Sequence, residues 1–184
     1  MMVELQIEEN EAVISLYLLI SRLLNEELSP ELREILIQPE VLDFLSRPEP
    51  EVRDYLMREW DDADYEQAAV DFCDTFILPD QSITPRAVAW LNEGDAVNAD
   101  GIHAVVDTIL REKHLSLPDG IDPLPYDHAS VLFFVAANLR QINDTQAGEF
   151  EKATLGSWIP AFGRALQKSS HCFYRAIGSI VASL

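Results

Sequence analysis

Hydrophobic residues recur at intervals of three and four positions along nearly the whole chain. The pattern is clearest in residues 13–24 and 102–110, where apolar side chains follow the i, i+3, i+4, i+7 spacing of one helix face. Convincing alternation of apolar and polar residues with a period of two, which is typical of strands, is absent. The pattern therefore predicts an all-α fold.

One segment is apolar around almost its whole circumference, at residues 131–137, 139 and 142. A helix of this kind is buried on all sides, so we expect it to be the central helix of a bundle. Ser29 followed by Pro30 predicts another helix start, as N-cap and first helical residue. Further helices are expected over residues 65–76, 155–166 and 173–181. With 184 residues, the prediction is a single domain, residues 1–184, that is a helical bundle of about eight or nine helices.

The net charge is strongly negative. The chain has 32 acidic and 13 basic residues and a formal charge of −19, with the acids concentrated in residues 1–100 and a mild basic excess in residues 151–184. Binding to nucleic acid or to an anionic membrane surface depends on clustered Lys and Arg, so both are disfavoured. The charge indicates either a solubility device with internal complementarity between the two ends or a recruited basic ligand.

Two observations bear on the compartment. Cys73 and Cys172 lie far apart and in no metal-ligand spacing, which argues against a disulfide framework or a structural zinc and suits a reducing compartment. The N-terminus is acidic where a secretory signal is basic, and the longest apolar run in residues 13–24 is Leu16–Ile20, whereas a membrane span needs about 20 residues. We therefore expect a soluble, cytoplasmic protein.

Most catalytic signatures are missing. The seven glycines form neither GxGxxG nor a phosphate-binding loop, and GxSxG and HExxH are absent, so we expect no enzyme activity and no bound cofactor. His103, Asp107 and His114 lie close to one face of a predicted helix. They are either metal ligands of a metal- or nucleotide-dependent hydrolase or the polar outer face that the apolar stripe demands.

The longest loop runs from Leu117 to Pro125, where prolines and glycine forbid a regular helix. At its end, Pro125, Tyr126, Asp127 and His128 lead into the central helix. We expect Pro125 in the first turn and Asp127 among the unpaired N–H groups at the positive end of the helix dipole. Asp127 and His128 are then either a helix cap and a packed loop residue, or a functional pair.

Three segments occur in a characteristic order. Residues 65–77 form a predicted helix with an aromatic end, which the stretch Ile83–Trp90 follows; Pro125–Leu132 contains Pro-x-Asp-His; residues 155–162 and Phe173-Tyr174 carry the C-terminal aromatic pattern. As a set they resemble the TorD/DmsD/NarJ family, the cytoplasmic chaperones that mature molybdenum-containing redox enzymes. Leu124 stands where that family usually has an acid, so the subgroup and the client enzyme stay open.

The resemblance implies binding rather than catalysis. It implies a chaperone that holds the twin-arginine signal peptide of a molybdoenzyme, contacts the catalytic subunit and assists cofactor insertion and export. The sequence leaves the oligomeric state open between a monomer and a domain-swapped dimer. The matching positions for signal-peptide binding are Asp127, His128, Trp90, Phe76, Pro85, Pro125 and Tyr126.

The chemistry of this chain suits that task, because paired arginines need carboxylates and the following apolar residues need an oily surface. We expect Asp127 to pair with an arginine and its carboxylate to be accessible. His128 is expected to orient the loop or to bond the peptide backbone, and Trp90 and Phe76 are either apolar walls of the site or ordinary core. The alternatives are the hydrolase and a helical interaction module without peptide binding.

Overall fold

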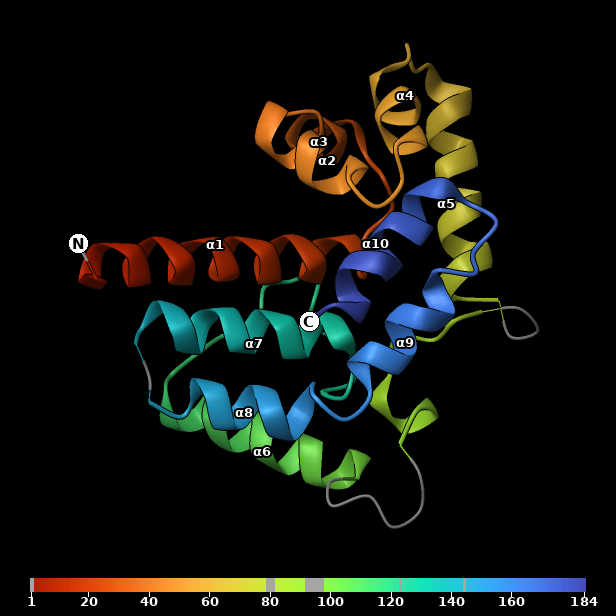
Figure 1. Cartoon of the computed structure of the whole chain (residues 1–184). Coiled ribbons are helices and arrows are strands. Elements are labelled where there is room, and N and C mark those ends of the chain that lie inside the picture. Colours follow the sequence, from red (N-terminus) through yellow and green to blue (C-terminus); the bar gives the residue numbers. More distant parts are fainter. Residues whose placement is uncertain (1, 79–81, 92–97, 123, 144) are drawn as a thin grey trace. The chain divides into compact units, whose positions relative to one another are not determined.

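The structure, a computed structural model, describes residues 2–78, 82–91, 98–122, 124–143 and 145–184. Within these residues the chain forms ten α-helices and one short 3-10 helix, with no strand (Figure 1). The elements are α1 (Met2–Leu23), α2 (Pro30–Leu36), α3 (Pro39–Ser46), α4 (Glu51–Met57), α5 (Asp62–Phe76), η1 (Ala87–Ala89), α6 (Ala99–Glu112), α7 (Ala129–Gln141), α8 (Ala147–Thr154), α9 (Ile159–Leu166) and α10 (Cys172–Ala182). The predicted all-α class is confirmed.

The chain divides into two compact units, each assembled from separate stretches of sequence. Residues 1–25 and 85–158 form the first unit, and residues 26–84 and 159–184 form the second. The expectation of a single domain over residues 1–184 stays a prediction. The described helices include none that combines the length and the apolarity needed to cross a membrane.

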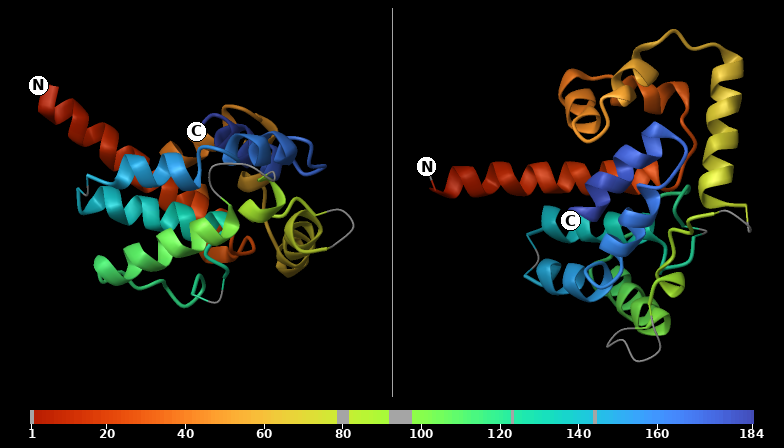
Figure 2. Two further views of the ribbon diagram at one scale, coloured as in Figure 1. Left: turned by 90° about the horizontal axis from the view of Figure 1, so that it is seen from below. Right: turned by 45° about the vertical axis from the view of Figure 1, so that its right-hand side comes forward.

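The first unit is built around α7. Nine of the thirteen side chains of α7 are buried, in keeping with its all-round apolar pattern, and α1 packs along its length (Figures 1 and 2). The Tyr17 and Phe133 rings lie 5.3 Å apart between these helices, and the Ser21 hydroxyl donates to the backbone carbonyl of Ser130 at 2.8 Å. Helices α8 and α6 also contact α7. Since α7 contacts all three, it holds the unit together.

An ion pair in the first unit links three of its helices. Arg140 of α7 donates from Nη2 to Glu151 Oε2 of α8 at 2.7 Å and from Nη1 to Asn10 Oδ1 of α1 at 3.2 Å. The Arg140 guanidinium also lies 5.8 Å from the centroid of the Tyr17 ring. These contacts fix the C-terminal end of α7. The candidate site lies at the opposite, N-terminal end.

The second unit depends on close contact between α9 and α10. A Cβ atom on Gly178 would lie 2.5 Å from the Gln167 nitrogen and 2.8 Å from the Gly163 carbonyl oxygen. Both are backbone atoms that cannot move aside, so the two helices approach at a distance that only glycine permits. Helix α10 also packs on α3 and α4.

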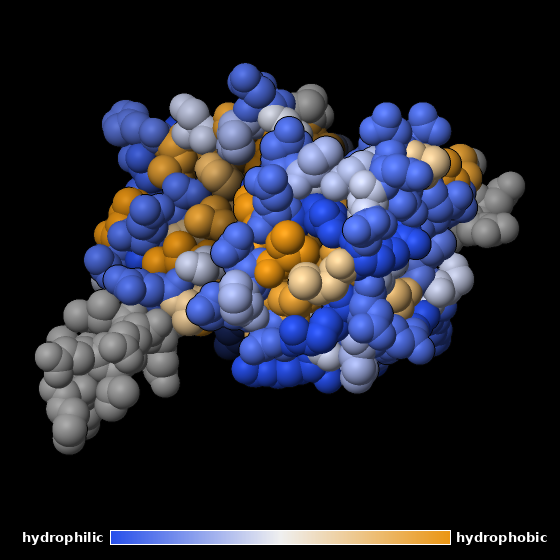
Figure 3. Space-filling model, turned by 90° about the horizontal axis from the view of Figure 1, so that it is seen from above, coloured by the Kyte–Doolittle hydropathy of each residue, from blue (hydrophilic) through white to orange (hydrophobic). Residues whose placement is uncertain are grey.

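Within the second unit, a basic side chain of the C-terminal stretch pairs with acidic side chains, which agrees with the interpretation of the charge pattern as internal complementarity. Arg175, from the mildly basic C-terminal stretch, donates to Glu49 at 3.3 Å and to Glu51 at 3.2 Å. The pair with Glu49 is partly buried and the pair with Glu51 is exposed, and pairs that reach solvent add little stability. The 13 bases of the chain also cannot match its 32 acids. The surface keeps a large acidic excess, and on the face drawn in Figure 3 hydrophilic residues surround smaller apolar groups.

The structure has more helices than the eight or nine expected. Helices α2, α3 and α4 have only seven or eight residues each, which is about two turns. Pro39 begins α3 and Pro50 is the N-cap residue of α4, so each proline ends the preceding helical pattern after a few residues. A hydrophobic period cannot be resolved over so short a stretch.

Candidate functional site

Two segments that lie some forty positions apart in sequence meet in the first unit. The Ala87 N–H donates to the Asp127 carbonyl at 2.9 Å, and the Ala129 N–H donates to the Pro85 carbonyl at 2.7 Å. These bonds make an isolated antiparallel bridge between Arg86 and His128. The loop that carries η1 is thereby fixed against the residues that precede α7, which brings two of the predicted motifs together.

Asp127 lies at the centre of this junction, and its side chain is fully buried at 0% exposure. Its Oδ1 accepts from Arg86 Nε at 3.1 Å and from Arg86 Nη2 at 2.9 Å. Its Oδ2 accepts from the Val88 N–H at 3.2 Å. Oδ1 also lies 3.2 Å from Nε2 of His103, a residue of α6. The carboxylate is therefore satisfied by donors of its own chain.

Burial raises the pKa of a carboxyl group, but the hydrogen bonds from these donors outweigh it and hold the pKa of Asp127 below its usual range. Asp127 is thus ionised at neutral pH although its side chain has no exposed surface. The expectation of an accessible carboxylate is wrong for this structure, because Arg86 and His103 cover it.

The covering side chains themselves reach solvent. The Arg86 side chain is 41% exposed and the His103 side chain is 42% exposed. The His103 ring also packs against Tyr126, with ring centroids 5.8 Å apart. Asp127 consequently lies one side-chain layer below the surface.

His128, not Asp127, caps α7. Its Nδ1 accepts from the Ser130 N–H at 3.2 Å, and the helix begins at Ala129, so Pro125 lies before the first turn rather than in it. Burial lowers the pKa of His128 to about 4, against the opposing effect of the Asp127 charge. The ring is neutral at physiological pH, and Nδ1 is free of a proton to act as the acceptor.

The remaining predicted site residues are distributed unevenly. Pro85 is buried, and Pro125, Tyr126 and Trp90 are partly buried, all within the segments that the bridge joins. Phe76 belongs to the second unit, where its ring lies 5.2 Å from the rings of Phe72 and Tyr174 and is part of the core. The structure does not test the prediction that these residues bind a signal peptide, and it stays a prediction.

Sequence reasoning missed the role of Arg86 and misplaced that of His103. Arg86 directly follows Pro85, a predicted site residue, and is one of only 13 Lys and Arg residues in the chain, so its position could have marked it as a partner for an acidic side chain of the site. His103 was grouped instead with Asp107 and His114 as a possible metal site.

That metal site does not form. Asp107 pairs with Arg111 at 2.9 Å, and α6 ends at Glu112, so His114 lies beyond the helix with a φ of 53°. Among the residues that the structure describes, no group of three or more His, Cys, Asp or Glu side chains could hold a metal ion.

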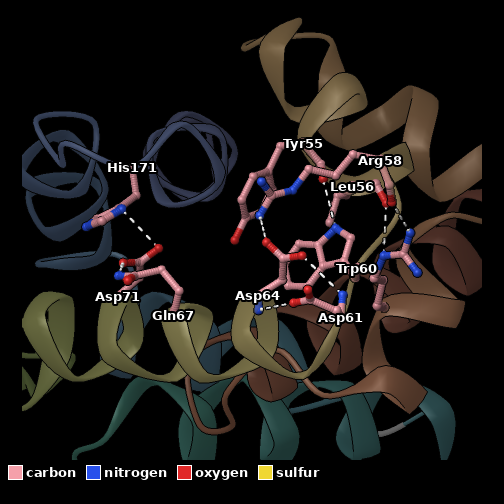
Figure 4. A network of polar contacts seen from close by, with 10 residues as sticks. Tyr55, Leu56, Arg58, Trp60, Asp61, Asp64, Gln67, Asp71 and His171 are labelled. Atoms are coloured by element: carbon pink, nitrogen blue, oxygen red, sulfur yellow. Dashed lines mark hydrogen bonds and ion pairs between the residues drawn. The ribbon is translucent and has the colours of Figure 1, made fainter.

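A second polar cluster, in the second unit, has a structural role. Arg58 pairs with Asp64 at 2.7 Å and stacks over Trp60 at 5.1 Å from the ring centroid, while the Trp60 indole N–H donates to the Tyr55 carbonyl at 3.1 Å (Figure 4). Asp61 and Asp64 complete a capping box at the start of α5. These contacts fix the connection between α4 and α5.

The same unit contains a His–Asp pair. His171, the residue before α10, lies with Nδ1 3.2 Å from Oδ2 of Asp71 on α5, and Gln67 donates to the other oxygen at 2.8 Å (Figure 4). The pair joins α5 to α10. Its acceptor atoms are therefore already used within the unit.

Comparison with known proteins agrees with the motifs. A family model described as nitrate reductase delta subunit matches residues 25–167, a stretch that includes Arg86, His103 and Asp127. The search of curated proteins returns no match. The chain belongs to the nitrate reductase delta subunit family, the NarJ/TorD-type chaperones of redox-enzyme maturation, as the resemblance predicts.

Proposed function

We propose that this protein is a cytoplasmic chaperone that binds the twin-arginine signal peptide of a molybdenum-containing, nitrate-reductase-like oxidoreductase. It assists the folding, cofactor insertion and export of that client, and its partner is the client's catalytic subunit. Family membership supports the chaperone role. For peptide binding, the supporting observation is that the buried Asp127 carboxylate already accepts a hydrogen bond from an arginine side chain, that of Arg86.

The charges of the chain favour an arginine-rich partner. The formal net charge of −19 attracts cationic peptides over a distance of about one Debye length, roughly 8 Å at physiological salt. Attraction of this kind is not selective between lysine and arginine. Selectivity requires a carboxylate that is held in place and screened from water, and Asp127 has both properties.

The apolar part of a signal peptide needs an apolar surface next to the arginine site. Val88 of η1 is 54% exposed, and its own N–H is bonded to Asp127. Trp90 ends the same turn, with its N–H donated to the Ala87 carbonyl at 2.9 Å. We assign the peptide's apolar contacts to this turn, with His128 orienting the loop from its cap position.

Calorimetric titration with synthetic leader peptides tests the proposal. A peptide with Arg-Arg before its apolar run is expected to bind, and a matched Gln-Gln peptide is expected to bind at least about tenfold more weakly, a difference of about 1.4 kcal/mol. Added salt is expected to weaken the Arg-Arg complex. Equal affinity for the two peptides would overturn the assignment of arginine recognition.

Recovery of the partner tests the wider role. Purified protein is expected to retain the catalytic subunit of a molybdoenzyme when that subunit carries its leader, and to lose it when the leader is deleted. Retention that ignores the leader favours the alternative of a helical interaction module without peptide binding.

A further inference from the structure

The carboxylate of Asp127 already holds a guanidinium group, the one at the end of Arg86. An arginine of a client peptide carries the same group, so it competes for the same oxygen atoms. We propose that Asp127 is an exchange site for arginine side chains, which Arg86 occupies in the free protein and leaves when a client arginine binds. The inference rests on the proposed function and adds the regulation of its site.

The resident pair lacks the strongest geometry of its type. Both nitrogens of Arg86 donate to Oδ1 of Asp127, at 3.1 and 2.9 Å, while Oδ2 is used by the Val88 N–H. The strongest arginine–carboxylate pairs place one nitrogen on each oxygen. Oδ1 also lies 3.2 Å from the His103 ring, so two side chains share it. An arginine side chain that is held through one shared oxygen can be replaced by another arginine.

The site keeps its shape when the Arg86 side chain turns away. The loop is held by backbone bonds from Ala87 to Asp127 and from Ala129 to Pro85, neither of which uses a side chain. The Val88 N–H still orients the carboxylate. Because Arg86 is 41% exposed, its guanidinium can rotate into water without any movement of the backbone.

A buried carboxylate without a cation is unfavourable, so the emptied site demands a positive ligand. The ligand that fits is planar and weakly hydrated, as a guanidinium is, because the site presents a fixed carboxylate below a half-exposed layer of side chains. A lysine ammonium is more strongly hydrated and is a poorer occupant. The exchange therefore selects arginine over lysine, which the acidic surface alone does not.

A tethered competitor lowers the affinity for the external ligand. A side chain on a short flexible tether competes at an effective concentration of about millimolar or more. Removing Arg86 is therefore expected to strengthen binding of an Arg-Arg leader peptide about tenfold or more. The matched control is Arg111→Ala, which removes the partner of Asp107 in an exposed pair of the same unit.

The first experiment measures the affinity of one Arg-Arg leader peptide for the wild type, Arg86→Ala and Arg111→Ala. We expect tighter binding for Arg86→Ala alone. Binding by Arg86→Ala that is no tighter than binding by Arg111→Ala overturns the exchange. Where Arg86→Ala fails to fold by far-UV circular dichroism, Arg86→Lys takes its place, because lysine keeps the charge but is a weaker competitor, and it too is expected to bind more tightly than the wild type.

The second experiment needs no peptide. Thermal unfolding of Arg86→Ala is followed with added ethylguanidinium and, separately, with ethylammonium at the same concentration. Relative to ethylammonium, ethylguanidinium is expected to give a higher melting temperature in Arg86→Ala than in Arg111→Ala, since it refills the site only in Arg86→Ala, while its general denaturing action is common to both variants. A difference between the two ions that is the same in Arg86→Ala and in Arg111→Ala contradicts a guanidinium site at Asp127.

Together the experiments separate the two proposals. Refilling by ethylguanidinium without peptide binding to any variant contradicts the signal-peptide function and supports the guanidinium site. Peptide binding that is indifferent to Arg86 contradicts the exchange and leaves the chaperone function standing.

Discussion

His128 makes the stability of the fold depend on pH between about 4 and 6.5. The ring is 8% exposed and caps α7 as a neutral acceptor, and burial lowers its pKa to about 4 from the ordinary 6.5. In the unfolded chain the imidazole takes up a proton near pH 6.5, whereas in the folded chain it does so only near pH 4. The unfolded state binds more protons in between, so the free energy of unfolding falls as the pH falls through this window.

The size of the effect follows from the two pKa values. The gap between 6.5 and about 4 corresponds to a loss of about 3 kcal/mol, fully developed at the acid end of the window. For a protein of this size, such a loss lowers the melting temperature by roughly 6 to 12 °C. Above about pH 7 the contribution is complete and the dependence vanishes.

Replacing His128 by Asn removes the titration and keeps the cap, because the Asn side-chain oxygen can accept from the Ser130 N–H. Urea unfolding followed by far-UV circular dichroism at a series of pH values is expected to show a weaker dependence for His128→Asn than for the wild type. The control is His114→Asn, at an exposed position whose φ of 53° asparagine tolerates. It is expected to follow the wild type. If His128→Asn loses as much stability as the wild type between pH 6.5 and about 4.5, the assignment of the effect to His128 is refuted.

Three further predictions concern stability. Asp127→Asn is expected to lower the free energy of unfolding by about 2 to 3 kcal/mol, because hydrogen bonds to a buried charge are lost while Arg86 can turn to water. Asp107→Asn, in an exposed pair, is expected to lower it by less than about 0.5 kcal/mol. Similar unfolding free energies for the two variants in urea would contradict this. Gly178→Ala is expected to lower the free energy of unfolding by about 3 kcal/mol or more, because the added methyl group clashes with backbone atoms. Gly148→Ala, with open space around it, is expected to raise it by up to about 1 kcal/mol in the same assay. An unaffected Gly178→Ala would show that α9 and α10 do not meet as described. The single-domain prediction requires near-UV and far-UV signals to change in one coincident transition, and two separated transitions would show that the units unfold independently.

The features that the sequence predicts correctly are local ones. The start of α2 follows from Ser29, whose hydroxyl accepts from the Leu32 N–H at 3.1 Å, and from Pro30 in the first turn. The burial of α7 follows from apolar residues on every side of one helix. Both depend on atoms within a few positions of each other, which is the range over which capping and periodicity act.

The cap of α7 shows where local reasoning reaches its limit. Asp127 is a common capping residue type, and His128 is an unusual one. The carboxylate is held instead by Arg86, forty-one positions earlier in the chain, and the cap moves by one residue to the imidazole. No local pattern records which distant side chain meets a carboxylate, so the sequence predicted the wrong residue as the cap of α7.

The buried carboxylate and the acidic surface therefore do different things. With 32 acids and 13 Lys and Arg residues, one-to-one pairing leaves at least nineteen acids without a Lys or Arg partner, and their field attracts cationic chains. Such attraction raises the rate of encounter and is screened by salt. Asp127 contributes nothing to it, because its charge is already balanced by Arg86. Under the proposed exchange, what Asp127 adds is a test of the arriving side chain: a group is retained only if it replaces the Arg86 guanidinium on this buried carboxylate, so the acidic surface attracts many basic segments and Asp127 selects the one with arginine.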